Sequence, residues 1–294
     1  MGYEFDWVDA FTARAFGGNG CAVVHGAAGL DADTCMAFVR ETGLVECTFL
    51  QASDVADIKV RYFLGQSEIP FAGHPTIATV ASMVDRGLAG AGDLRLETGA
   101  GVIPISVEIA ADGVPNITMT QIRPGFGIKV APEIVAAVGG LKAGDIVGVP
   151  QVVSTGLPAC ITVLKDKAAL RRANMDVAAL QRFRAVVGDA ESQIMEPFWV
   201  TLGGETDAGQ TFSRLLLPPP GPLEDAFTGS ATGAMAAYLW AAGMLDRPKF
   251  VAEQGHWMGR PGRAQVEVLG PRDDTSGVRV GGQGYVMMRG SLNL

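Results

Sequence analysis

The sequence is poor in metal-binding and redox residues, and this shortage excludes several classes of function. It has three histidines and four cysteines in 294 residues, and the cysteines show no CxxC or other spacing typical of metal ligands. No signal peptide is expected, because the segment Met1–Trp7 contains two acidic residues and no apolar run. Free thiols in a reducing cytoplasm are the simplest interpretation of Cys21, Cys35, Cys47 and Cys160.

Charge and long apolar runs are also scarce. Charged residues make up 18% of the chain and the formal net charge is −8. No Lys/Arg cluster offers the basic face that a nucleic-acid partner requires. The apolar stretches are short and interrupted by glycine, so we expect no membrane span. With 48% hydrophobic residues the chain still has enough apolar material for two domain cores. This favours a globular protein that binds a small molecule.

What the sequence does contain is an internal duplication. A shift of 156 residues aligns EIPFAGHPTIATVASMVDRG, Glu68–Gly87, with EDAFTGSATGAMAAYLWAAG, Glu224–Gly243. Continued as far as Gly255, the alignment has nine identities in 32 positions without a gap. Each segment is typical of a turn followed by a helix, and its last glycine can supply a left-handed C-terminal cap.

Both predicted helices are apolar on all sides. The runs TIATVASMV and ATGAMAAYLWAAG contain no charged residue, and a helix without a polar face is expected to be buried. Pro75 suits the first position of the first helix, and Ser230 is expected to be the N-cap of the second. One such helix in each half predicts that each half wraps a sheet around its own central helix.

The rest of each half has the spacing of short strands and turns. Asp31–Gly43 is the clearest amphipathic helix of the first half, and Ala131–Val138 and Ala168–Val186 provide helical material in the second. Strand-like runs outnumber these helices, and hairpin spacing outweighs a β-α-β alternation. We therefore predict an α+β protein of two pseudo-symmetric halves, each a curled, mostly antiparallel, barrel-like sheet around a central helix.

The boundary between the halves is expected where the strand pattern breaks. The run RPGFG at Arg123–Gly127 is the predicted linker. The first half then comprises residues 1–123 together with a C-terminal strand at about 284–294, and the second half comprises residues 124–283.

The two helix starts are candidate anion sites. Each would offer backbone N–H groups and the positive end of a helix dipole. If the halves pack with pseudo-twofold symmetry, Gly73-His74 and Gly229-Ser230 would face one another across a cleft and stabilise a carboxylate or an enolate-like intermediate. The same pattern also fits two helices that are only well capped and buried, so the spacing leaves both interpretations open.

Three ionisable residues are candidates for acid/base chemistry. His74 breaks the repeat opposite Ser230, and Asp225 precedes the second turn opposite the apolar Ile69. Glu46 stands in the apolar, strand-like run LVECTFL, where partial burial would suit a carboxyl group to proton transfer. A structural histidine and an outward-facing strand glutamate are the common alternatives.

A serine hydrolase is not indicated. The run Thr228–Gly233 reads TGSATG and lacks the first glycine of G-x-S-x-G, so the nucleophile elbow is absent. Ser230, His74 and Asp225 are the residue types of a catalytic triad, but residue types alone are weak evidence for its geometry.

Taken in chain order, these motifs resemble the phenazine-biosynthesis (PhzF-like) family. DAFT at Asp9–Thr12 with FGGN at Phe16–Asn19 is similar to its N-terminal signature. ETGLVE at Glu41–Glu46 is similar to the motif that carries its catalytic glutamate. The motifs that follow are matched by Pro70–Thr76, Glu224–Ala231, Glu253–Gly255 and Met258–Gly262. The resemblance spans the whole chain.

The resemblance implies the fold of diaminopimelate epimerase and proline racemase, with a site between two α/β halves. It implies a cofactor-independent isomerase that uses no metal, flavin or pyridoxal phosphate, acts on a small carboxylated substrate and forms a homodimer. By the family pattern Glu46 would be the proton-transferring acid/base, and His74 and Asp225 would hold and polarise the substrate. Hydrogen bonds to the substrate would come from Gly73, Gly229 and Ser230. The best-known family reaction shifts a double bond in dihydro-3-hydroxyanthranilate.

The chain also departs from the pattern of its relatives. Ala72 and Thr228 stand where the epimerases have two cysteines, so a two-thiol racemase mechanism is not expected. The glutamate motif, usually close to N-L-S-E-T, reads GLVEC at Gly43–Cys47, and Gly20 and Ala226 stand where the family usually has proline. Because the surroundings of the acid/base residues differ, the substrate need not be the phenazine precursor. One alternative is a racemase or epimerase of an amino or hydroxy acid, with Glu46 and Asp225 replacing the thiols. Another is a non-catalytic protein that binds a small molecule.

Overall fold

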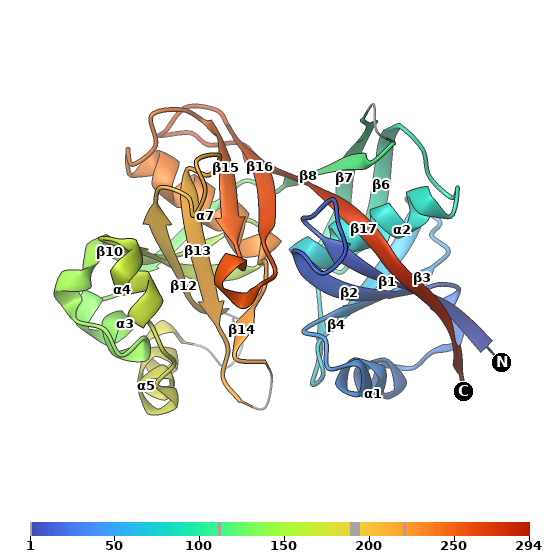
Figure 1. Cartoon of the computed structure of the whole chain (residues 1–294), viewed down its shortest axis with the longest axis horizontal. Coiled ribbons are helices and arrows are strands. Elements are labelled where there is room, and N and C mark those ends of the chain that lie inside the picture. Colours follow the sequence, from blue (N-terminus) through green and yellow to red (C-terminus); the bar gives the residue numbers. More distant parts are fainter. Residues whose placement is uncertain (1, 111–112, 189–194, 220–221) are drawn as a thin grey trace. The chain divides into compact units, whose positions relative to one another are not determined.

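The computed structural model describes residues 2–110, 113–188, 195–219 and 222–294 (Figure 1). Its contacts divide the chain into two compact units. Unit 1 consists of Met1–Thr120, Gly259–Gly262 and Gly281–Leu294, and unit 2 consists of Gln121–Met258 and Arg263–Val280.

Unit 1 is built from short strands and two longer helices. Its strands are β1 (Gly2–Ala10), β2 (Asn19–Val24), β3 (Cys47–Gln51), β4 (Ile58–Phe63), β5 (Glu68–Ile69), β6 (Gly92–Thr98), β7 (Gly101–Ile109), β8 (Pro115–Gln121) and the larger part of β17 (Gly277–Asn293). Its helices are α1 (Ala32–Thr42), α2 (Gly73–Asp85) and the 3-10 turn Ala27–Gly29.

The strands of unit 1 close into a barrel. Antiparallel pairs β1–β2, β3–β4, β6–β7 and β7–β8 alternate with the parallel pairs β2–β3 and β4–β6. β17 pairs with both β1 and β8, which joins the two edges. Because β1 and β17 run antiparallel, Gly2 lies opposite Asn293 and the two ends of the chain are neighbours. Figure 1 shows α2 enclosed by the strands and α1 on their outer side.

Unit 2 repeats this plan with more helices. Its strands are β9 (Gly125–Lys129), β10 (Ile146–Ser154), β11 (Pro158–Leu164), β12 (Met195–Leu202), β13 (Thr211–Leu216), β14 (Glu224–Asp225), β15 (Lys249–Gln254) and β16 (Gly262–Leu269). Its helices are α3 (Pro132–Val138), α4 (Lys167–Arg172), α5 (Val177–Val187), α7 (Gly229–Ala241) and the 3-10 turns Ala143–Asp145 and His256–Met258.

The duplication predicted from the sequence is confirmed by the structure, and so is the α+β class. α2 and α7 are both 13 residues long and begin at Gly73 and Gly229, the positions that the sequence alignment matches. In both units a parallel pair is followed by an antiparallel pair: β2–β3–β4 in unit 1 and β11–β12–β13 in unit 2. In each unit the strand before the turn pairs in parallel with the strand that follows the central helix: β4 with β6 and β13 with β15.

Each unit fastens the turn before its central helix with the same ion pair. Arg61 of β4 donates to both carboxylate oxygens of Glu68, through Nε at 2.8 Å and Nη2 at 2.7 Å. Arg214 of β13 holds Glu224 in the same way, with Nη2 2.8 Å from Oε2. A bidentate guanidinium–carboxylate pair fixes direction as well as position. It therefore orients the first residue of β5 and of β14 against the neighbouring strand.

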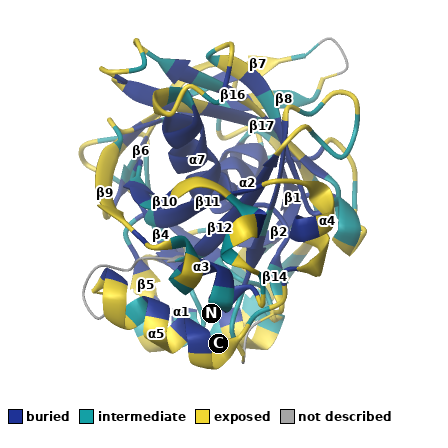
Figure 2. Cartoon of the chain, turned by 90° about the vertical axis from the view of Figure 1, so that its left-hand side faces the viewer, coloured by how far each residue is buried: buried dark blue, intermediate teal, exposed yellow. Residues whose placement is uncertain are grey.

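The two central helices are buried along almost their whole length, as the sequence predicted. Residues Gly73–Met83 of α2 and Gly229–Leu239 of α7 are all buried. Figure 2 shows both helices in the colour of buried residues, whereas α1 and α5 have exposed faces. Gly87 and Gly243 follow the helices with positive φ angles of 69° and 71°, which confirms the predicted left-handed caps.

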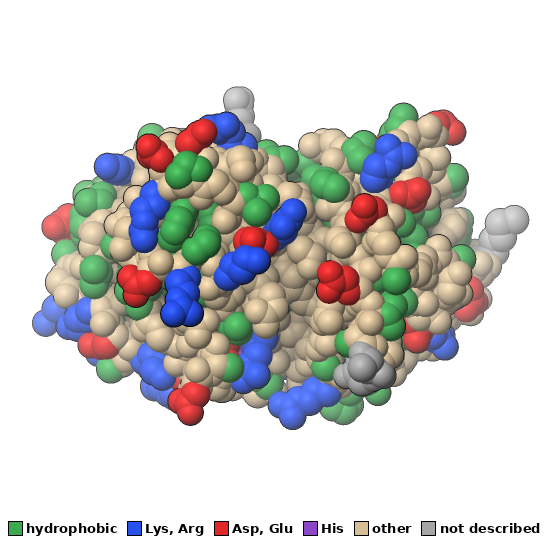
Figure 3. Space-filling model, turned by 90° about the horizontal axis from the view of Figure 1, so that it is seen from above, with side chains coloured by type: hydrophobic (Ala, Val, Ile, Leu, Met, Phe, Trp, Pro, Cys, Tyr) green, Lys and Arg blue, Asp and Glu red, His purple; other side chains and the backbone are tan. Residues whose placement is uncertain are grey.

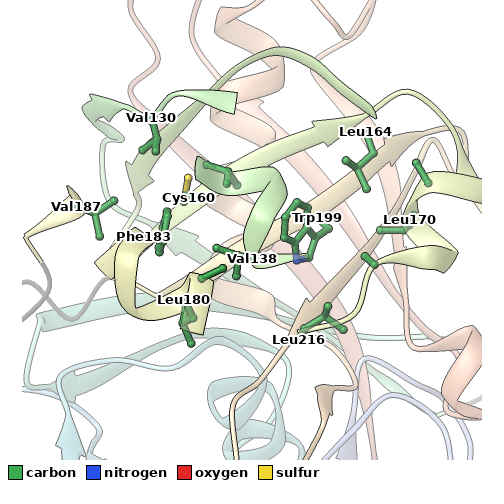
Figure 4. Packing of buried hydrophobic residues seen from close by; sticks show 14 of the residues in the cluster. Val130, Val138, Cys160, Leu164, Leu170, Leu180, Phe183, Val187, Trp199 and Leu216 are labelled. Carbon is green, nitrogen blue, oxygen red and sulfur yellow. The ribbon is translucent and has the colours of Figure 1, made fainter. Parts of the chain in front are cut away.

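A further hydrophobic cluster fixes the outer helices of unit 2. Trp199 of β12 is fully buried among side chains of α3, α4 and α5, including Val138, Leu170 and Phe183 (Figure 4). In unit 1 the helix α1 has the equivalent position, since its buried Cys35 and Val39 belong to a cluster with aromatic residues of β3 and β4.

Several local predictions were wrong in detail. Ser230 is the second residue of α7, because the helix begins at Gly229 and the N-cap is Thr228. The predicted helical material of Ala168–Val186 forms two helices, α4 and α5, separated by a break after Arg172. Part of the predicted linker Arg123–Gly127 belongs to β9, which begins at Gly125 and pairs with β10.

Gly284 offers a test of how closely β17 packs on α2. A Cβ atom at this position would lie 2.4 Å from the Cβ of Ala81, and neither atom can rotate away. We expect Gly284→Ala to lower the free energy of unfolding by about 1–3 kcal/mol, as other insertions into a packed core do. The matched control is Gly90→Ala, since a Cβ at Gly90 would meet nothing within 4 Å. Urea denaturation of both variants would measure the difference, and equal stabilities would contradict the close packing of β17 on α2.

Candidate active site

Unit 1 brings together two of the residues singled out from the sequence. The Nδ1 atom of His74 lies 3.6 Å from Oε2 of Glu46. His74 is 3% exposed and the Glu46 side chain 14%, so the carboxyl group keeps limited access to solvent. At 3.6 Å the two atoms are close neighbours but too far apart for a direct hydrogen bond.

The position of Glu46 follows from the end of α1. Asp31 caps the start of this helix by accepting from the backbone N–H of Thr34 at 2.8 Å, and Gly43 ends it with a φ angle of 68°. The chain then turns back, and β3 begins at Cys47 with four buried residues. The run LVECTFL suggested that Glu46 lies within a strand, but it lies just before β3. Its side chain therefore starts from the residue that precedes a buried strand.

The position of His74 follows from the start of α2. The N-cap Ala72 has no side chain that could cap the helix, and Thr76 instead donates to the carbonyl of Ala72 at 2.7 Å. The hydroxyl of the buried Tyr62 lies 2.8 Å from Thr76 Oγ1 and fixes this first turn from the side of β4. His74 is thus carried by a rigid, buried helix start.

Asn19 is a third member of this cluster. Its Nδ2 atom lies 3.0 Å from Nδ1 of His74. An amide nitrogen can only donate, so in this arrangement Nδ1 accepts and the proton of the neutral imidazole is on Nε2. The contact with Asn19 thus defines which ring nitrogen carries the proton when the imidazole is neutral.

The loop before Asn19 has a strained backbone and is held by several hydrogen bonds. Phe11 and Phe16 have positive φ angles of 63° and 65°, which are unusual for aromatic residues. The buried Asp9 accepts from the backbone N–H of Phe16 at 2.7 Å and from Arg260 Nη2 at 2.6 Å. Arg260 also donates to the carbonyls of the loop residues Gly17 and Gly18. These contacts explain why Gly259–Gly262 belongs to unit 1.

Unit 2 contains the other predicted site residues. Asp225 ends β14, is 3% exposed, and accepts a 2.6 Å hydrogen bond at Oδ2 from the hydroxyl of Thr228. Gly229 and Ser230 follow as the first two residues of α7 and are also buried. The side chain of Thr228, the N-cap, is directed to Asp225 and forms no cap hydrogen bond. The first turn of α7 therefore receives no cap from that side chain.

Asn19 and Gln254 were not singled out from the sequence as individual site residues. Both lie in motifs that matched the family pattern, FGGN and EQG, and that was the available signal. Repeat spacing could not reveal them, because each contacts its site through a strand distant in sequence: Asn19 begins β2 and Gln254 ends β15.

The four cysteines are unsuited to a thiolate mechanism. All four are free and buried. Burial raises the pKa of the Cys47 thiol and of the Cys160 thiol to about 12, and that of Cys35 to about 11. At neutral pH these thiols stay protonated. Neither helix start carries a cysteine, since Ala72 and Thr228 are the N-caps.

The described part of the chain was also searched for metal sites and membrane-spanning helices. Within residues 2–110, 113–188, 195–219 and 222–294, no three or more His, Cys, Asp or Glu side chains are grouped to hold a metal ion. No helix among the same residues is long and apolar enough to cross a membrane. On the face shown in Figure 3, basic and acidic side chains are interspersed.

Comparison with solved structures defines the class of protein first. The chain is similar to a PhzF-family phenazine biosynthesis protein from Bacillus anthracis, with a TM-score of 0.86, 25% identity and full coverage of both chains. It shares its fold with a hydroxyproline epimerase from Agrobacterium vitis, with a TM-score of 0.66 and 12% identity over 99% of this chain and 91% of that one. The fold is therefore that of the epimerase-like isomerases.

Sequence comparison then gives the family. The family described as phenazine biosynthesis-like protein matches residues 8–290, and the chain belongs to it. The chain is 31% identical to the uncharacterized isomerase YddE of Escherichia coli strain K12, over 95% of each chain. It is 30% identical to the trans-2,3-dihydro-3-hydroxyanthranilate isomerase of Pseudomonas aeruginosa, over 98% of each chain. The protein is an isomerase of this family.

The contact between Asn19 and His74 predicts a defined tautomer. In the unmutated protein the ¹⁵N spectrum at alkaline pH should show His74 protonated at Nε2 only, because Asn19 donates to Nδ1. Asn19→Leu removes the donor and should populate both tautomers. With three histidines in the chain, His74→Gln suffices to assign the resonance. A proton on Nδ1 in the unmutated protein would show that Asn19 is not the donor in this contact.

Proposed function

We propose that the protein catalyses proton transfer on a small carboxylated substrate, with Glu46 as the acid/base that removes and returns the proton. The observation that carries the proposal is the pairing of a partly exposed carboxyl group with a buried imidazole 3.6 Å away. Both are held by elements with little freedom: a buried strand and the first turn of a buried helix. Such a preorganised pair suits general acid/base catalysis.

His74 has a separate role in this proposal. A neutral imidazole whose Nδ1 accepts from Asn19 presents its Nε2–H as a donor. A donor of this kind can polarise a carbonyl or carboxylate of the substrate without a change in net charge. Glu46 is then free to alternate between its protonated and ionised forms while His74 keeps its proton. The two residues therefore divide proton transfer and electrophilic assistance between them.

The residues of unit 2 supply substrate binding. Gly229 and Ser230 open α7, where backbone N–H groups and the helix dipole favour a negatively charged group. Gly73 offers the same feature at the start of α2. The Asp225 carboxylate, fixed by Thr228, is suited to accept a hydrogen bond from a hydroxyl or amino group of the substrate. The proposed substrate is thus a small carboxylic acid that also carries a polar donor.

The double-bond shift is preferred to racemization because of the residues at the helix starts. A two-thiol mechanism needs cysteines where this chain has Ala72 and Thr228. One acid/base residue suffices for a suprafacial allylic shift, in which the proton leaves one carbon and returns to another on the same face. The reaction as proposed requires no cofactor, and the reducing cytoplasm in which buried thiols persist is the proposed location.

Solvent exchange tests this proposal directly. The protein would be incubated in D₂O with a panel of small carboxylic acids, including trans-2,3-dihydro-3-hydroxyanthranilate, and followed by NMR. We expect deuterium to enter a substrate carbon, and Glu46→Gln to slow its entry by about 100- to 10,000-fold, the usual contribution of a general acid/base. Asp225→Asn should weaken turnover of the same substrate.

Glu41→Gln is the matched control for this experiment. Glu41 is an exposed residue of α1 near Glu46 in the sequence, and its replacement should leave the rate unchanged. Exchange that persisted in Glu46→Gln would remove Glu46 from the assigned role. Deuterium confined to an inverted stereocentre, with no displaced double bond, would assign the protein to the epimerases instead.

A further inference from the structure

The carboxylate of Asp225 is the end point of a buried hydrogen-bond chain. Gln254 Nε2 donates to Thr228 Oγ1 at 3.1 Å, and Thr228 Oγ1 donates to Asp225 Oδ2 at 2.6 Å. Gln254 is fully buried, and Thr228 and Asp225 are 6% and 3% exposed. Three side chains from β14, the helix start and β15 are thereby joined in one line.

The donor and the acceptor of every hydrogen bond in this hydrogen-bond chain are determined. The Oε1 atom of Gln254 accepts the backbone N–H of Thr228 at 3.1 Å, so the amide cannot be turned round without placing two donors against each other. Its Nε2 atom must then face the carbonyl of Asp225, at 2.9 Å, and the hydroxyl of Thr228. Because the hydroxyl oxygen receives the amide proton, its own proton points to the Asp225 carboxylate.

The duplication shows that the fold does not need this hydrogen-bond chain. At the matched positions of unit 1, Ile69 replaces Asp225, Ala72 replaces Thr228 and Thr98 replaces Gln254. Unit 1 nevertheless forms the same turn and a central helix of the same length.

Contacts that the architecture does need are present in both units. One is the pair of Glu68 with Arg61, matched by Glu224 with Arg214. Another is the bond from Thr76 to the carbonyl four residues earlier, matched by Thr232. A network kept in one unit only, at a residue proposed to bind substrate, indicates function.

We propose that Thr228 and Gln254 are positioning residues, which orient the Asp225 carboxylate for the substrate. This inference rests on the function proposed above for Asp225. Thr228 supplies a short hydrogen bond to one carboxylate oxygen, and Gln254 ensures that the hydroxyl proton has no other direction. The carboxylate is thereby held in one rotamer before substrate arrives, which lowers the entropy cost of forming the reactive complex.

The kinetic test uses the D₂O exchange reaction. Thr228→Val keeps the shape of the side chain and removes the hydroxyl, and we expect it to lower kcat/KM by about 10- to 100-fold, the worth of a hydrogen bond to a charged group. Thr228→Ser keeps the hydroxyl and should restore most of the activity. Gln254→Met keeps the volume but not the amide and should also lower the rate.

A double-mutant cycle separates positioning from a general structural effect. If Thr228 acts through Asp225, Thr228→Val should change the rate by no more than about twofold once Asp225→Asn is present. Additive losses would overturn the proposal. The control is Thr201→Val, which removes another buried hydroxyl of unit 2, one that donates to the carbonyl of Phe212. It should leave exchange unchanged.

A second measurement does not depend on catalysis. The Thr228 hydroxyl proton should appear in the ¹H NMR spectrum as a downfield signal, protected from solvent, that Thr228→Val removes. Asp225→Asn and Gln254→Met should each shift it upfield. A signal unaffected by both changes would disprove the network even if the protein is active. An unmutated protein inactive on every compound, with the signal behaving as expected, would instead disprove the proposed function and leave the network intact.

Discussion

The complete burial of one apolar helix in each unit is the constraint from which the site follows. A helix without a polar face must be surrounded, and in this protein strands enclose α2 and α7. The start of such a helix lies inside the protein, and its first backbone N–H groups lie there with it. Neither N-cap residue covers them with its side chain, since one is Ala72 and the side chain of Thr228 is directed elsewhere. The fold thus creates buried donor groups at two helix starts, which is the feature that an anionic substrate would use.

The two units show what a duplicated scaffold keeps and what it changes. Both keep the arginine–glutamate pair before the turn and the glycine after the helix. Among the residues that differ are two to which we assign a chemical role: His74 corresponds to Ser230, and Asp225 corresponds to Ile69. Each unit therefore contributes a different group to the reaction as we propose it. The shared contacts set the geometry of the helix start, and the divergent residues decide what that start can do.

Much of the fold was predictable because its signals are local. The repeat, the two buried helices, the capped helix α1 and most strands can be found from periodicity and from glycine positions. The contacts of Asn19 and Gln254 were not predictable in the same way, since they join strands far apart in the sequence and depend on barrel closure. The N-cap of α7 was predicted two residues too late, at Ser230 instead of Thr228, because both serine and threonine are common N-cap residues. The segment Gly259–Gly262 belongs to unit 1 because Arg260 donates a hydrogen bond to Asp9, and no periodic pattern in the sequence predicts such a contact.

The residues before the paired glycines show how an epimerase-like scaffold can serve a different reaction. A thiol in each unit would give two acid/base groups, one to remove a proton and one to deliver it from the opposite face, as a two-thiol racemization requires. In this chain the position in unit 1 is Ala72, which has no functional group, and the acid/base residue that we propose is Glu46, just before β3. In unit 2 the position is Thr228, whose hydroxyl does not ionise at neutral pH as a thiol can, but which donates a hydrogen bond to the Asp225 carboxylate. One proton-transferring group and one fixed acceptor suit a proton that leaves and returns on the same face of the substrate. The absence of both thiols is therefore consistent with an isomerase that shifts a double bond and keeps the stereochemistry of the face on which it acts.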